Sequence, residues 1–263
     1  MPPETYARES LTGSPKHRIT SRKEGAVAVI EFSRPPLNFF SVGLLREIVD
    51  AFEEADQQDD IRAIVLSSAG KNFCAGADLA GESSDPFELY EQAERLFSIR
   101  KPSIVAIQGA AIGGGLGLAV AADFRVVTPK SKLSANFVKL GMHPGFALTH
   151  TLPRLLGPQT ASLLLLTGRR VSGEEALRIG LADAVADPEN LLASAISLAA
   201  EIAENAPLAV ESTRAALRVD LVAKIRPHTS EEARIQTSLM QTEDFSEGVR
   251  AVAERRKGNW KRK

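Results

Sequence analysis

The residues best suited to chemistry are three successive glycines, Gly113-Gly114-Gly115. An apolar run at residues 104–107 precedes them and predicts a buried strand, while the small and apolar residues 116–122 predict a helix. Glycine allows positive φ and lets a ligand approach the backbone closely. Because the first N–H groups of a helix have no partner within it, this turn is a candidate site for an anion or a carbonyl oxygen. Close packing is the alternative explanation for the same glycines.

A second loop lies upstream of these glycines. Residues 63–68 (AIVLSS) predict another buried strand, and FCAGADL follows at residues 73–79. The stretches SSAGKNFCAGADL and KPSIVAIQGAAIGGGLGLAVAADFRVV together resemble the crotonase (enoyl-CoA hydratase/isomerase) superfamily. The resemblance continues through LGMHPGFALTHTLPRLLG and LLTGRRVSGEEALRIGLADAV to DFSEGVRAVAERRKGNW, so it covers roughly residues 19–260.

The resemblance implies a substrate and a site. The substrate is an acyl-CoA thioester, and the N–H groups of Ala75 and Gly114 form an oxyanion hole that stabilises its enolate. Coenzyme A enters as part of the substrate, with no separate cofactor and no metal. The other residues that the resemblance places at the substrate are Arg34, Phe39, Cys74, Ala77, Asp78, Leu79, Gly113, Gly117 and Phe137.

The sequence departs from the family pattern where proton transfer is expected. Hydratases of this family carry two glutamates, and the corresponding positions here are Gly117 and Phe137, which cannot transfer a proton. His143 is the remaining candidate acid or base, with His150 as a second; a structural role in the loop is the alternative for both. Asp123 is expected to cap backbone groups.

Two functions therefore stay open. The first is an enzyme of the hydratase/isomerase type, a lyase or isomerase of fatty acid metabolism, that does enolate chemistry with an atypical proton-transfer group. The second is a non-catalytic protein that binds or shuttles acyl-CoA, with Phe39, Phe40 and Phe137 lining an apolar acyl tunnel. Turnover of a CoA thioester would separate the two.

The fold class expected is α/β: a crotonase-like ββα spiral core followed by a helical C-terminal oligomerisation region. We predict a disordered segment at residues 1–17, the acyl-CoA-binding core at 18–206 and the helical region at 207–263. Ser41, Asp85 and Ser172 read as helix N-caps. After residue 207 the pattern predicts one helix over residues 207–222 and another over 229–254, the latter opened by a capping box at Thr229.

Composition limits the partners. With 32 basic and 33 acidic residues the net charge is −1, so no global field favours nucleic acid or an anionic membrane. The single cysteine, Cys74, excludes an internal disulfide and reads as a packing residue. No apolar stretch reaches membrane-spanning length, so we expect a cytoplasmic protein. The family resemblance implies a homotrimer or a hexamer.

Overall fold

The computed structural model describes residues 5–9, 17–78 and 85–263. Its main sheet runs antiparallel from the first strand to the third and parallel from there onward. In spatial order its strands are β1 (Thr5–Glu9), β2 (Arg18–Glu24), β3 (Val27–Ser33), β4 (Ala63–Ser68), β5 (Ser103–Ile107), β7 (Phe124–Val127) and β10 (Ala184–Val185). A smaller sheet holds β6 (Ala110–Ile112), β8 (Lys132–Ser134) and β9 (Val171–Ser172).

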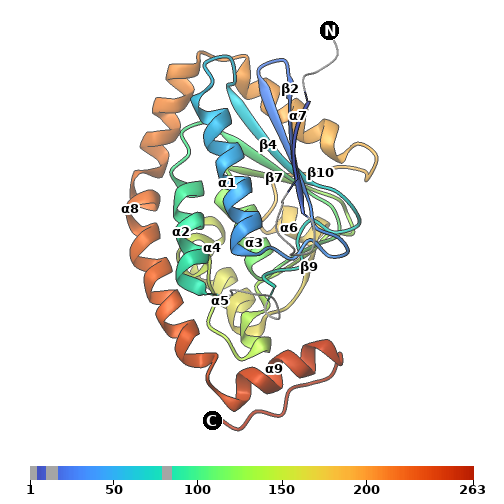
Figure 1. Ribbon diagram of the computed structural model, residues 1–263, viewed down its shortest axis with the longest axis vertical. Coiled ribbons are helices and arrows are strands. Elements are labelled where there is room, and N and C mark those ends of the chain that lie inside the picture. Colours follow the sequence, from blue (N-terminus) through green and yellow to red (C-terminus); the bar gives the residue numbers. More distant parts are fainter. Residues whose placement is uncertain (1–4, 10–16, 79–84) are drawn as a thin grey trace.

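Helices cover both faces of the main sheet (Figure 1). They are α1 (Val42–Gln57), α2 (Pro86–Phe97), α3 (Gly114–Ala121), the 3₁₀ helix η1 (Asn136–Leu140), α4 (Leu148–Leu156), α5 (Pro158–Thr167), α6 (Gly173–Arg178), α7 (Leu191–Ala203), α8 (Pro207–Leu239) and α9 (Glu243–Ala253).

Alternation along the strands explains the two layers. In β3, Val27 and Val29 pack with α7, whereas Ile30 and Phe32 pack in the larger core that contains α1. Successive side chains of a strand point to opposite faces, so a strand buried on both faces reads as a continuous apolar run. The α/β fold with a helical C-terminal region, expected from the sequence, is confirmed.

The three predicted helix caps are confirmed. Ser41 accepts a hydrogen bond from the Leu44 N–H, Asp85 from Phe87 and Ser172 from Glu175. These side chains satisfy N–H groups that a helix start would otherwise leave unpaired.

The N-terminal segment differs from the expectation of disorder. Residues 5–9 form β1, which pairs antiparallel with β2, while residues 1–4 and 10–16 lie outside the part described. Pairing with an open strand edge supplies order that the composition of a short segment does not reveal.

The predicted division of the C-terminal helices is wrong. Instead of ending near residue 222, α8 continues through Pro227 to Leu239, and Thr242 caps α9 by accepting from the Phe245 N–H. The Thr229 hydroxyl bonds the carbonyls of Ile225 and Arg226 and does not cap a helix start. Packing of α8 along α2 overrides these local signals.

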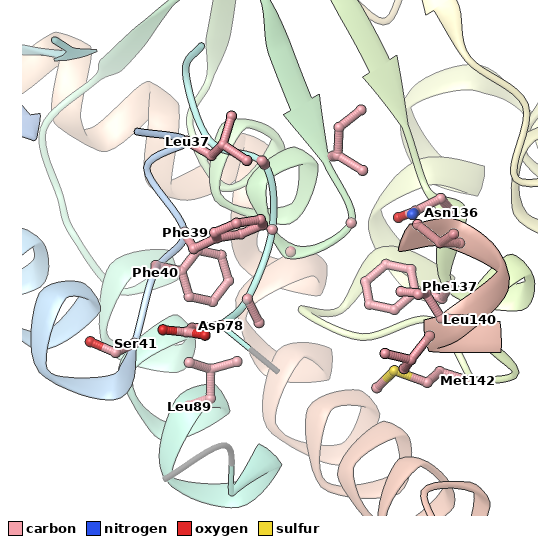
Figure 2. Close-up of a pocket in the computed structure, with 18 of the residues that line it drawn as sticks. Leu37, Phe39, Phe40, Ser41, Asp78, Leu89, Asn136, Phe137, Leu140 and Met142 are labelled. Carbon is pink, nitrogen blue, oxygen red and sulfur yellow. The ribbon is translucent and has the colours of Figure 1, made fainter. Parts of the chain in front are cut away.

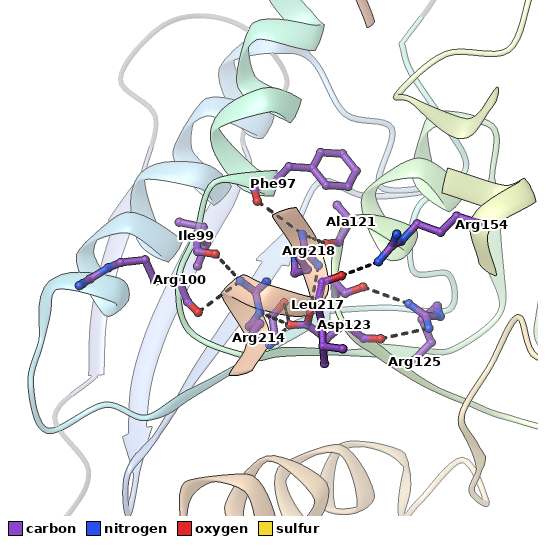
Figure 3. Close-up of polar contacts among 12 residues, drawn as sticks. Phe97, Ile99, Arg100, Ala121, Asp123, Arg125, Arg154, Arg214, Leu217 and Arg218 are labelled. Carbon is purple, nitrogen blue, oxygen red and sulfur yellow. Dashed lines mark hydrogen bonds and ion pairs between the residues drawn. The ribbon is translucent and has the colours of Figure 1, made fainter. Parts of the chain in front are cut away.

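A partly buried aspartate joins α8 to the core (Figure 3). Asp123, at the junction of α3 and β7, accepts from the Ser103 N–H at 2.8 Å, as capping predicts. It also pairs with Arg214 at 2.8 Å and with Arg218 at 2.9 Å, both from α8. Since Leu221 of α8 also belongs to the larger core, residues beyond 207 share the core of the residues before them.

Candidate functional site

A cavity of about 520 Å³ opens between the loops that follow β3 and β4, the small sheet and the C-terminal helices. Phe39 and Phe40 stand on one side, and Phe137 and Met142 face them from the other (Figure 2). The remaining wall comes from the loop after β4, the start of α3, and helices α2, α8 and α9. Because the wall is mostly apolar with a few polar groups, it suits an organic ligand.

The two glycine-containing loops meet at this cavity. The Cys74 N–H donates to the Ala110 carbonyl at 2.9 Å, and the Ile112 N–H donates to the Cys74 carbonyl at 3.0 Å. A Cβ at Gly115 would lie 2.4 Å from the Cys74 oxygen, so only glycine permits this approach. Ala75 and Gly114 thus line the same cavity.

The two N–H groups expected to form the oxyanion hole differ in whether they already donate a hydrogen bond. Gly114 is the first residue of α3, where N–H groups have no partner within the helix. The Ala75 N–H donates to the Leu37 carbonyl at 3.1 Å. Any ligand oxygen that accepts from the Ala75 N–H would therefore have to displace the Leu37 carbonyl or share that N–H with it.

An ion pair fixes the segment that carries Phe39. The buried Arg34 guanidinium donates to the Phe39 carbonyl and to the Asp78 carboxylate, each at 2.6 Å. Phe39, Ala77 and Asp78 line the cavity, whereas Arg34 supports them from behind. Leu79 lies outside the described residues.

Cys74 holds a packing position. It is fully buried, it does not line the cavity, and burial raises the pKa of its thiol to about 12. Because the thiolate is the reactive form, this cysteine is no nucleophile at neutral pH.

The two positions where the family resemblance expects glutamates differ in their surroundings. Phe137 lines the cavity beside Gly113. Gly117 lies outside the lining, and a Cβ built there would lie 2.4 Å from the Phe146 Cβ. The Phe146 ring in turn packs edge-on against Phe40, at 6.1 Å between ring centroids.

Phe146 lies in a strained turn. Phe146 and Ala147 have φ of 62° and 57°, a conformation that costs free energy for residues with a Cβ. The carboxylate of Glu232, from α8, accepts from the Ala147 N–H at 2.7 Å and from the Thr149 N–H at 3.1 Å. The turn is therefore held by a residue 85 positions away in sequence.

Comparison with known proteins assigns the family. A family model described as Enoyl-CoA hydratase/isomerase matches residues 22–263. The chain belongs to the enoyl-CoA hydratase/isomerase family. This is a family of enzymes, and the resemblance drawn from the sequence motifs is confirmed.

Individual relatives agree with this family assignment. A crotonyl-CoA hydratase of Syntrophomonas wolfei is 35% identical over 252 residues, covering 92% of this chain and 97% of the relative. A short-chain-enoyl-CoA hydratase of Clostridium acetobutylicum is 32% identical and covers 92% and 96%. The structure of an enoyl-CoA hydratase/isomerase from Pseudoalteromonas atlantica matches with a TM-score of 0.85 at 27% identity, covering 92% and 99%.

The histidine considered for proton transfer is placed away from the cavity of this family member. His143 does not line it, and its Nδ1 lies 2.7 Å from the Pro144 oxygen. His150 stacks on His228 with ring centroids 4.6 Å apart, also outside the lining. Neither His143, in the loop between η1 and α4, nor His150, in α4, borders the cavity.

Sequence reasoning missed several polar residues of the cavity wall. Tyr90 donates to Gln236 at 2.7 Å, and Gln236 donates to the His143 carbonyl at 2.7 Å. Asn136 and Arg170 also line the cavity. No sequence motif marks these four residues. The one usable signal was that Asn136 directly precedes Phe137, a predicted site residue.

Some general features of the described residues are plain. They contain no cluster of three or more histidine, cysteine, aspartate or glutamate side chains that could hold a metal ion. None of the helices in the part of the chain described combines the length and apolarity needed to cross a membrane.

Proposed function

We propose that the protein binds an acyl-CoA thioester in this cavity and stabilises the enolate of its acyl group. The thioester oxygen accepts from the Gly114 N–H and competes with the Leu37 carbonyl for the Ala75 N–H. The observation that carries the proposal is the junction of the FCAGAD loop with the start of α3 on an apolar cavity of about 520 Å³. Fixed donors at developing negative charge favour an enolate.

The proposed chemistry is not that of an ordinary hydratase. Adding water across a double bond needs an acid and a base, and Gly117 and Phe137 supply neither. Among the described residues that line the cavity, the one carboxylate, Asp78, is already paired with Arg34. We therefore place proton transfer on the substrate or on water.

The second candidate is a non-catalytic acyl-CoA carrier. The packing of Phe146 over Gly117 favours it, because this ring fills space next to a position where the family resemblance expects a catalytic carboxylate. A measured turnover of any CoA thioester decides for the enzyme. The cytoplasmic location stays a prediction in either case.

Binding of an acyl-CoA tests the proposal directly. In calorimetry, butyryl-CoA should bind to the wild-type protein, and Gly114→Pro should bind it about tenfold more weakly than Gly114→Ala. Both variants add the same Cβ against the Phe40 ring, but only proline removes the N–H, and proline is tolerated at the first position of a helix. Absence of binding at millimolar concentration would refute the proposed function.

We also propose a homotrimer or hexamer assembled through the C-terminal helices. Leu208, Leu217 and Val219 of α8 are 79%, 69% and 65% exposed, more than single surface residues require. Light scattering at micromolar concentration should give three or six times the chain mass of 28.2 kDa. Leu217→Glu should lower this mass, and a monomeric wild-type protein would contradict the prediction.

A further inference from the structure

The charges on the cavity wall are unbalanced. Among the described residues, two charged side chains line it, Asp78 and Arg170. Asp78 is neutralised by Arg34, whose Nη2 lies 2.6 Å from its Oδ2. Arg170 makes no hydrogen bond or ion pair with any residue in the described ranges. The wall therefore offers one cation that is free to meet a ligand.

Strand register brings this cation to the proposed thioester site. In the small sheet, Ile112 of β6 pairs with Ser134 of β8, and Leu133 of β8 pairs with Val171 of β9. Arg170 comes one residue before β9, so it falls across from Ser134. Gly113 comes one residue after β6, so it lies at the same end of the strands as Arg170. Arg170 and the start of α3 thus lie at the same end of the small sheet, and both line the cavity.

A polar side chain lies beside the first of the three glycines. The Asn136 carboxamide lines the cavity, and its Oδ1 lies 3.2 Å from the position of a Cβ built on Gly113. It makes no hydrogen bond within the described part of the chain. In Figure 2 it sits above Phe137, so this polar end borders an aromatic wall. Gly168, two residues before Arg170, packs 3.2 Å from the Asn136 Cα, measured from a Cβ built on Gly168.

We propose that the acyl group of the substrate carries a carboxylate, and that Arg170 binds it beside Asn136. This inference rests on the proposed acyl-CoA binding. The planar guanidinium offers paired N–H donors that match the two oxygens of a carboxylate. An apolar wall without a cation would disfavour that charge, whereas a neutral acyl group gains nothing from Arg170.

Matched pairs of thioesters test the inference. Calorimetry on the full chain compares malonyl- with propionyl-CoA, succinyl- with butyryl-CoA, and glutaryl- with pentanoyl-CoA, so each pair differs in one carboxylate at equal carbon number. We expect the acidic member of at least one pair to bind about tenfold more tightly at low salt. Arg170→Gln should abolish this preference and leave the affinity for the neutral member unchanged.

The neighbouring arginine provides the control. Arg169 does not line the cavity and pairs with Glu175 at 3.3 Å, so Arg169→Gln should keep the preference. If the protein binds the acidic and the neutral member of every pair with equal affinity, this inference alone is overturned. If Arg170→Gln weakens the binding of both members of a pair equally, the inference is also overturned. That result would assign Arg170 to the phosphates of coenzyme A, which both members share. Failure of every thioester to bind would overturn the proposed function and this inference with it.

Discussion

Wild-type protein is expected to hydrate crotonyl-CoA with a turnover below about 0.1 s⁻¹. A typical enzyme turns over at about 10 s⁻¹, and a positioned acid or base contributes roughly 10²–10⁴-fold. Gly117 and Phe137 provide no such group, and His143 lies outside the cavity lining. Loss of the enoyl-thioester absorbance measures the rate. A turnover of tens per second would show that these positions are misassigned or dispensable.

The structure also predicts that restoring glutamates at positions 117 and 137 is not enough to restore hydration. Gly117→Glu alone should unfold the protein or cost it more than about 3 kcal/mol, because even a Cβ at 117 lies 2.4 Å from the Phe146 Cβ. Phe137→Glu should be better tolerated, since Phe137 borders the cavity. Combining both with Phe146→Gly removes the clash and suits the positive φ of 62° at residue 146. We expect weak hydration only in this triple variant.

A thermodynamic cycle isolates the clash from the chemistry. Gly117→Ala and Phe146→Gly should each destabilise the protein, and the double variant should lose about 1–3 kcal/mol less than the two losses added together. Strict additivity would show that Phe146 does not exclude a side chain at 117.

The features predicted from the sequence were the ones that local chemistry encodes. Helix caps at Ser41, Asp85 and Ser172 depend on residues within one turn, so their positions could be read directly. The meeting of Ala75 and Gly114 at one cavity followed from family motifs. The occupation of the Ala75 N–H by the Leu37 carbonyl did not, because backbone pairing between distant loops leaves no residue signature.

The missed features depend on contacts between elements far apart in the chain. Thr229 reads as a cap locally, yet its hydroxyl bonds Glu94 of α2 and it lies within a helix that α2 stabilises. Gly117 reads as a lost glutamate, but only the fold shows Phe146 against it. Glu232 reads as part of a capping box for its own helix and instead serves the start of α4.

Replacing Glu232 with alanine is expected to lower the free energy of unfolding by about 3–4 kcal/mol. Its carboxylate is 1% exposed and accepts from the N–H groups of Ala147 and Thr149 and from the Thr149 hydroxyl. Truncation leaves these donors unpaired and removes the contact that offsets the positive φ of Phe146 and Ala147. Urea denaturation followed by circular dichroism measures the loss. The exposed neighbour is the control, and Glu231→Ala should change stability by less than about 0.5 kcal/mol.

The same carboxylate should make stability depend on pH. Burial raises the pKa of Glu232 from 4.5 to about 7, although three hydrogen bonds oppose the shift. The folded protein then holds a proton that the unfolded chain releases between these values. Its contribution to stability is therefore full below about pH 4.5 and falls, by at most about 3 kcal/mol, as the pH rises to about 7. Glu232→Gln removes this titration, so its stability relative to wild type should rise between pH 5 and about pH 7.5. Glu231→Gln is the control: it replaces an exposed carboxylate and should not reproduce this rise. If the stability of Glu232→Gln and of wild type changed with pH in parallel, the raised pKa would be refuted.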